Sequence, residues 1–113
     1  MSKQNALTIA PPYPVEQAIK RLAADLRTAR LRRNLTIENV ARKIGTGPRA
    51  VMDAEKGKPS TAFVVYAGLL WTYGLLDQMD TVADPARDEA GQMLASADER
   101  SRAREKGKLD DDF

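Results

Sequence analysis

Apolar residues recur at steps of three and four through the first third of the chain, which is the period of one face of a helix. This run predicts a helix that starts just after Pro14 and ends near Asn34. Asparagine is common at such an end because it can adopt a left-handed conformation. The apolar face of this helix consists of Val15, Ala18, Ile19, Leu22, Leu26 and Ala29.

Two short helices are expected next. Thr36 can cap a helix over 37–44, because its hydroxyl can accept a hydrogen bond from an orphan backbone N–H. After the turn Gly45-Thr46-Gly47, Pro48 suits the first position of a helix over 48–55, where its missing N–H costs nothing. Gly57 ends that helix. The positions expected to face inward are Ile37, Val40, Ala41, Ile44, Val51 and Ala54.

A fourth helix is expected to be capped by Ser60 or Thr61 and closed by Gly74. Four consecutive apolar residues at 63–66 also permit a strand, but the length of the stretch and its caps favour a helix. A fifth short helix is predicted over 75–82.

The prediction is therefore all-α: a five-helix bundle with an additional C-terminal helix and a disordered tail. Residues 1–14 would form a flexible arm and residues 15–82 the bundle. Residues 83–104 would form a polar helix that Asp84-Pro85 opens. An acidic disordered tail would follow over 105–113.

The composition favours binding over catalysis. The 113 residues include no cysteine and no histidine. Disulfides, zinc–thiolate sites and cysteine nucleophiles are thereby excluded, and the usual near-neutral general base is missing. No carboxylates cluster in a pocket-forming pattern. We therefore expect no catalytic residue, no metal and no cofactor. No apolar run is long enough to span a membrane, and the N-terminus lacks the pattern of a signal peptide, so a cytoplasmic location is expected.

The charge is divided between the two halves of the chain. Residues 1–59 hold 12 Lys+Arg and 5 Asp+Glu, which gives +7, whereas residues 60–113 hold 6 and 11, which gives −5. A basic half predicts contact with nucleic acid, and the acidic half indicates a different partner. The alternative is a pair of solvated helix faces without partners.

Two short helices joined by a glycine-containing turn form a helix-turn-helix unit. In this unit Ala41 must be small because the next helix crosses closely, and Gly45 allows the turn. The stretch resembles the Cro/C1-type (Xre) helix-turn-helix family over about residues 18–77. The matching residues are Thr36, Val40-Ala41, Gly45, Val51 and Glu55-Lys56-Gly57-Lys58.

Further segments resemble HipB-type antitoxins within that family. The resemblance implies a homodimer that binds a HipA-type serine/threonine kinase toxin. It also implies that the protein represses its own operon at a palindromic double-stranded DNA operator, and so lies with the bacterial nucleoid. The segments are Pro59-Ser60-Thr61, Leu70-Trp71-Thr72-Tyr73-Gly74-Leu75-Leu76-Asp77, Ala83-Asp84-Pro85 and Asp110-Asp111-Asp112-Phe113.

The second helix of such a unit lies in the major groove of DNA. Arg49 is the expected base reader, because a guanidinium can bond guanine O6 and N7 together; a phosphate contact is the alternative. Pro48 and Met52, both expected to be exposed, would touch thymine methyls or nothing. Asp53, also expected to be exposed, would accept from cytosine or only tune the charge. Contacts to the DNA backbone are expected from Lys43, Thr46, Lys56, Lys58, Arg32 and Arg33.

The chain departs from the family at Ile37, Gly47 and Pro48, where many members carry polar residues. Fewer side-chain hydrogen bonds are then available, and DNA shape would carry more of the specificity. A protein-interaction module that no longer reads DNA, or a phage-type regulator without a toxin partner, stays open. The family resemblance also implies that Arg30 and Glu55 form a surface ion pair that orients the reading helix.

A bundle of about 60 residues cannot hide every large apolar group. We therefore expect a symmetric dimer contact from Trp71, Tyr73, Leu75 and Leu76, although core positions are the alternative. The acidic half would face the protein partner. Phe113 would be an anchor that orders on binding, or else part of a solubility or degradation tail. The acidic residues expected to meet a basic partner are Asp84, Asp88, Glu89, Asp110, Asp111 and Asp112.

Overall fold

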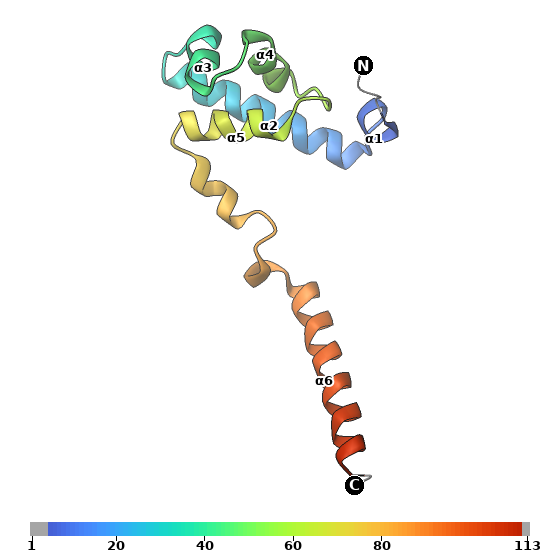
Figure 1. Cartoon of the computed structure of the whole chain (residues 1–113). Coiled ribbons are helices and arrows are strands. Elements are labelled where there is room, and N and C mark those ends of the chain that lie inside the picture. Colours follow the sequence, from blue (N-terminus) through green and yellow to red (C-terminus); the bar gives the residue numbers. More distant parts are fainter. Residues whose placement is uncertain (1–4, 112–113) are drawn as a thin grey trace. The chain divides into compact units, whose positions relative to one another are not determined.

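A computed structural model describes residues 5–111, with side chains for residues 5–107. Every regular element in this part is helical and no strand occurs in it, so the all-α prediction is confirmed and the strand at 63–66 is excluded (Figure 1). The elements are α1 (Ala6–Ile9), α2 (Tyr13–Arg32), α3 (Ile37–Ile44), α4 (Pro48–Lys56), α5 (Phe63–Thr72), the 3-10 helices η1 (Leu76–Thr81) and η2 (Pro85–Arg87), and α6 (Glu89–Asp111).

The chain forms two compact units, one up to Asp77 and one from Gln78 onward. In the first unit α4 packs against α2, α3 and α5, and α3 also packs against α5. The most deeply buried large side chains are Leu26, Val40, Val51 and Leu69, one from each of these four helices. The aliphatic core is therefore shared by α2, α3, α4 and α5, as their spacing of apolar residues requires.

Local signals in the sequence set the ends of α3 and α4. Thr36 precedes α3, and its Oγ1 accepts a hydrogen bond from the backbone N–H of Asn39 at 3.1 Å. Pro48 occupies the first turn of α4. Gly45 and Gly57 end the two helices with φ angles of 81° and 71°, a region that side chains other than glycine rarely adopt. The turn between α3 and α4 thus has only three residues.

Gly57 also permits a close approach between α4 and α2. A Cβ atom added at Gly57 would lie 3.2 Å from the Cα of Lys20. A side chain where α4 ends would therefore be in tight contact with the backbone of α2, and one of the two helices would have to shift by a few tenths of an ångström. No atom outside the neighbouring residues lies within 4 Å of the corresponding Cβ position at Gly45.

The N-terminal region is more ordered than the sequence indicates. Residues 1–4 lie outside the described part, but α1 forms within the segment expected to be a flexible arm, and Asn5 Oδ1 caps it by accepting from the N–H of Thr8 at 2.9 Å. The next helix, α2, begins at Tyr13, two residues earlier than expected. Pro12 precedes it and Pro14 fits within its first turn, where a missing N–H is not needed.

The prediction for the start of α5 was wrong by one or two residues. Ala62 precedes this helix and offers no side-chain cap. The N–H of Thr61 donates to the carbonyl of Lys58 at 3.0 Å, so Thr61 belongs to a turn that comes before the helix. Neither Ser60 nor Thr61 is therefore the cap. The segment expected as a fifth α-helix is instead the 3-10 helix η1, and Leu75 lies outside it.

The second unit contains a longer α6 than expected. Asp84 caps η2 by accepting from the N–H of Ala86 at 3.0 Å, and α6 starts only after Asp88, whose Oδ1 accepts from the N–H of Gly91 at 2.9 Å. The helix continues to Asp111, so residues 105–111 are helical where a disordered tail was expected. The Ala, Arg, Glu and Lys residues that fill it are strong helix formers. Residues 112 and 113 lie outside the described part.

Within residues 5–111, no helix combines the length and the apolar character that crossing a membrane requires.

Candidate nucleic-acid interface

The helix α4 divides into an inner and an outer side. Val51 and Ala54 are completely buried and fasten the inner side to the core. On the outer side, Pro48 and Arg49 are exposed, and 75% of the Arg49 side chain is accessible to solvent. Arg49 is therefore a base-reading candidate that the fold leaves accessible to a ligand.

Asp53 lies between two cations. Its Oδ1 is 3.4 Å from the Nε of Arg49, one turn earlier on α4, and 3.2 Å from the Nζ of Lys58. The Asp53 side chain is only 24% exposed, so the expectation of an exposed Asp53 was wrong. Its carboxylate is already engaged with cations, which favours the charge-tuning role over hydrogen bonding to cytosine. Arg49 can leave Asp53 at little cost, because its own side chain is largely solvated and surface ion pairs contribute only about 0–1 kcal/mol.

Met52 was also expected to be exposed, and it is half-buried instead. It lines a shallow groove of about 260 Å³ where α2, α3 and α4 meet. The other lining residues are Arg27, Arg30, Ile37, Glu55 and Lys56. The Met52 side chain therefore packs partly against neighbouring helices, and less of it is available to a thymine methyl group.

The buried side of α4 is braced by Arg30 and Glu55. Arg30 Nε donates to Glu55 Oε2 at 2.7 Å and Arg30 Nη2 donates to Glu55 Oε1 at 3.0 Å, while Arg30 Nη1 donates to the carbonyl of Leu35 at 2.9 Å. The expected ion pair is present, but it is not a surface pair: the two side chains are 10% and 6% exposed. The hydrogen bond to Glu55 raises the pKa of Arg30 above its ordinary value. The pair joins α2, α4 and the segment before α3.

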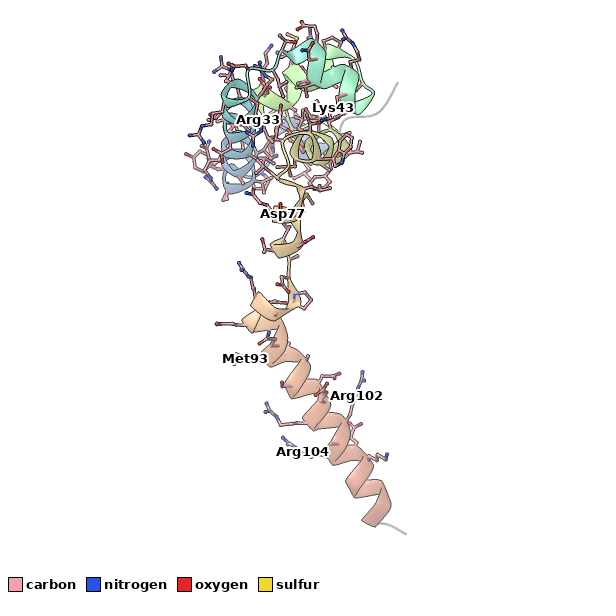
Figure 2. The ribbon with its side chains drawn as sticks, turned by 90° about the vertical axis from the view of Figure 1, so that its left-hand side faces the viewer. Arg33, Lys43, Asp77, Met93, Arg102 and Arg104 are labelled. Atoms are coloured by element: carbon pink, nitrogen blue, oxygen red, sulfur yellow. The ribbon has the colours of Figure 1, made fainter. Side chains whose placement is uncertain are left out.

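The residues expected to contact the DNA backbone fall into two groups. Lys43, Lys56 and Arg32 are exposed, and Thr46 and Lys58 are half-buried. Lys43, which Figure 2 labels, lies near the end of α3 and places its Nζ 5.6 Å from the centre of the Trp71 ring. Lys43, Lys56 and Arg32 therefore have the accessible charge that a phosphate contact needs.

Arg33 has a structural position that the sequence did not indicate. Its Nη1 donates to the carbonyl of Ala29 at 2.9 Å, and its Nη2 donates to the carbonyl of Tyr73 at 3.0 Å. The guanidinium also lies 5.6 Å from the centre of the Tyr73 ring. Arg33 therefore ties the end of α2 to the end of α5, and two of its donors are not available for phosphate.

The predicted dimer surface needs one correction. Tyr73 is only 4% exposed and belongs to the core of a single chain, so it is not a dimer contact. Trp71 and Leu76 are 55% and 40% exposed, and Leu75 is half-buried.

The buried position of Tyr73 also affects its hydroxyl. Burial raises the pKa of the Tyr73 hydroxyl to about 12, with Glu55 adding to the shift and Arg30 and Arg33 opposing it.

The exposure of two apolar residues at the start of α5 was not predicted from the sequence. Phe63 and Val64 are 61% and 74% exposed at the start of α5. Four consecutive apolar residues on a helix point in all directions and cannot all face one core, which is the signal that could have revealed them. Val64, Trp71 and Leu76 also border a groove of about 600 Å³. The groove is completed by Lys43, Ile44, Gly45, Thr46, Val65, Ala67 and Gly68.

The acidic residues of the second unit have mixed roles. Asp84 and Asp88 use their carboxylates to cap η2 and α6, so the helix starts already engage them, whereas Glu89 is exposed. Asp110 and Asp111 belong to α6, but their side chains lie outside the described residues, as do Asp112 and Phe113. The proposed anchor at Phe113 therefore stays a prediction.

No family model, curated protein or solved structure matches the chain. A functional assignment therefore depends on the residues of this chain and their geometry.

Proposed function

We propose that the protein is a sequence-specific DNA-binding repressor, in which α3, the three-residue turn and α4 form a helix-turn-helix unit of the Cro/C1 type. The observation that carries the proposal is the geometry of α4. Val51 and Ala54 fix its inner side in the core, the buried pair of Arg30 and Glu55 braces it, and Arg49 extends from its first turn into solvent. A helix held in this way can present one side chain to DNA without losing its orientation.

In this proposal the first turn of α4 enters the major groove. Arg49 leaves Asp53 and donates two hydrogen bonds to O6 and N7 of one guanine. Lys43, Lys56 and Lys58 contact phosphates and fix the register of the helix on the duplex without reading sequence. The negative charge of Asp53 repels a phosphate or any other hydrogen-bond acceptor placed beside it. Asp53 therefore limits the positions on the DNA at which Arg49 can bind.

The repressor would act as a homodimer. Val64, Trp71 and Leu76 are exposed apolar side chains around one groove, and burying them would remove apolar surface from water. Two copies related by a two-fold axis would place their reading helices about 34 Å apart, which is one turn of DNA, and the operator would be palindromic.

The antitoxin part of the proposal concerns the second unit. None of its described side chains is buried, and the 23-residue α6 contacts η2 near its start, where Gln92 Nε2 donates to the carbonyls of Pro85 and Ala86 at 2.9 and 3.1 Å. A long exposed helix of this kind suits binding to another protein, and the resemblance to HipB-type antitoxins implies that this partner would be a HipA-type serine/threonine kinase. The protein would then neutralise the kinase and repress the shared operon.

One observation favours a second candidate, a protein-interaction module that does not read DNA. Gly47 and Pro48 open α4 with no side-chain hydrogen-bond cap, so fewer polar side chains are available there than a base-reading helix commonly offers. The two candidates separate in one experiment. A gel shift with the DNA upstream of the gene should give a complex that contains two chains per duplex and resists an excess of shuffled duplex. The module predicts no complex, or one that shuffled duplex removes at equal concentration.

A further inference from the structure

The charges of the second unit are separated along the chain. Residues 78–99 hold six carboxylates and one arginine, whereas residues 100–107 hold Arg100, Arg102, Arg104 and Lys106 against Glu105 alone. All side chains from residue 100 to residue 107 are exposed. The net negative charge of the second half therefore conceals a basic segment on α6.

Two of these arginines lie on the same side of the helix. Arg100 and Arg104 are four residues apart, so their side chains are neighbours. The positions three and four residues on either side of them carry Ser96, Ala97, Ser101, Ala103, Gly107 and Lys108, none of which is a carboxylate. Glu105 is adjacent in sequence and does not face either arginine across a turn. The two guanidinium groups thus repel each other without local compensation.

Arg102 has a different environment. Its Nη2 lies 3.2 Å from the Oδ2 of Asp98, one turn earlier. Arg102 and Arg104 project from opposite sides of α6, and Met93 shares the side of Arg104 (Figure 2). On one side of α6, Arg102 is therefore paired with a carboxylate. On the other side, Arg100 and Arg104 have no carboxylate within one turn to balance their charge.

We propose that the side of α6 formed by Arg100 and Arg104 binds the phosphate backbone of the DNA that the first unit holds. This inference rests on the proposed function. A duplex carries about one negative charge per 1.7 Å of its axis, so it offers phosphates to both arginines at once. It would also relieve their mutual repulsion, which a single carboxylate of a protein partner would do only in part.

The covalent linkage between the two units also favours DNA over a protein partner as the ligand of this side of α6. Once the first unit is bound, α6 of the same chain is held near the duplex at a high effective concentration. A contact that is weak alone can then contribute to affinity. Because guanidinium–phosphate contacts carry no sequence information, α6 would increase the affinity for every duplex and leave the discrimination to α4.

The test compares two double variants of the full chain with equal change of charge. Arg100→Gln with Arg104→Gln removes the proposed contacts. Arg87→Gln with Arg102→Gln removes two exposed arginines from the same unit, one of them already paired with Asp98. Fluorescence anisotropy measures the affinity of each protein for a 40-base-pair duplex from upstream of the gene and for a shuffled duplex, between about 50 and 200 mM salt.

Each phosphate contact contributes about 0.9 to the slope of log K against log salt. The Arg100/Arg104 variant should therefore lose up to about 1.8 of slope per chain, and its affinity for the two duplexes should fall by the same factor. The Arg87/Arg102 variant should lose less than half of that slope.

Four results would overturn either the role of α6 or the proposed function. An unchanged slope in the Arg100/Arg104 variant, or equal losses in both variants, overturns the role of α6 and leaves the proposed function intact. Loss of discrimination between the duplexes in the Arg100/Arg104 variant also overturns it, because a phosphate contact is sequence-independent. A wild-type protein that binds neither duplex overturns the proposed function itself.

Discussion

Arg30 on α2 and Glu55 on α4 form a two-point ion pair, with donor–acceptor distances of 2.7 and 3.0 Å, in which both side chains are almost completely buried. Such a pair is costly to break from one side, because the remaining charge stays in a medium that solvates it poorly. Arg30→Met should therefore lower the free energy of unfolding by about 3–5 kcal/mol, measured by urea denaturation at pH 7.

The exposed pair of Lys20 and Glu16 on the same helix provides the control for Arg30→Met. Its side chains are 54% and 37% exposed, with an Nζ–Oε1 distance of 2.9 Å. Glu16→Gln should cost less than about 1 kcal/mol, since water already solvates both partners. Equal losses for Arg30→Met and Glu16→Gln would show that burial of the first pair does not stabilise the position of α4.

A second prediction concerns the contact between α4 and α2. Gly45 and Gly57 both have positive φ angles, but only Gly57 approaches another backbone. Gly45→Ala should cost about 1–2 kcal/mol of stability for the left-handed conformation alone. Gly57→Ala should cost clearly more, because its Cβ would lie 3.2 Å from the Cα of Lys20. Thermal denaturation of the two variants measures the difference, and equal melting temperatures would contradict the close approach.

A third prediction concerns alkaline pH. Burial raises the pKa of Tyr73 to about 12 in the folded protein, compared with about 10 in the unfolded chain. The neutral hydroxyl is thus favoured by folding, so its contribution is complete below pH 10 and is lost as the pH rises toward 12. This loss amounts to on the order of 2 kcal/mol.

Tyr73→Phe removes the titrating group. Among the described residues the Tyr73 hydroxyl has no hydrogen-bond partner, so the variant should be at least as stable as the wild type at pH 7. Its stability should then fall less between pH 10 and pH 12. Tyr13→Phe, at a residue that is 72% exposed, is the control and should follow the wild type. Parallel curves for Tyr73→Phe and the wild type would contradict the role of burial.

A fourth prediction concerns the proposed dimer. Val64→Lys places a charge on the exposed start of α5, whereas Val82→Lys makes the same change at a residue that is 66% exposed in the second unit. In sedimentation equilibrium, Val64→Lys should weaken dimerisation at least about tenfold, because a charge would be buried in the interface. Val82→Lys should leave it unchanged. A wild-type protein that is monomeric at about 50 µM would contradict the proposed dimer, since obligate dimers stay associated at such concentrations.

Local sequence signals predicted the region from α3 to α4 well. Thr36 as a cap, Gly45 and Gly57 as helix ends and Pro48 in the first turn act within a few residues of themselves. Their effect therefore does not depend on how the rest of the chain folds. The apolar spacing likewise placed Val51 and Ala54 in the core.

Long-range contacts could not be predicted in the same way. Arg33 and Tyr73 are 40 residues apart, and nothing near either residue indicates that the guanidinium reaches the carbonyl of the other. The half-burial of Met52 depends on where α2 and α3 lie, which a period of three and four does not specify. The sequence underestimates the length of α6, because a polar, charged composition is typical of disordered segments although many of the same residues favour a helix.

The central claim is that Arg49 reads DNA sequence, and it is tested most directly by the ratio of affinities for the upstream duplex and a shuffled duplex. Specific binding typically exceeds non-specific binding by about 10³-fold or more. We expect a wild-type ratio in that range, a reduction of about 5- to 150-fold in Arg49→Ala, and little change in Arg21→Ala, which removes an exposed arginine of α2. A wild-type ratio near one, or equal ratios for the two variants, would contradict the claim.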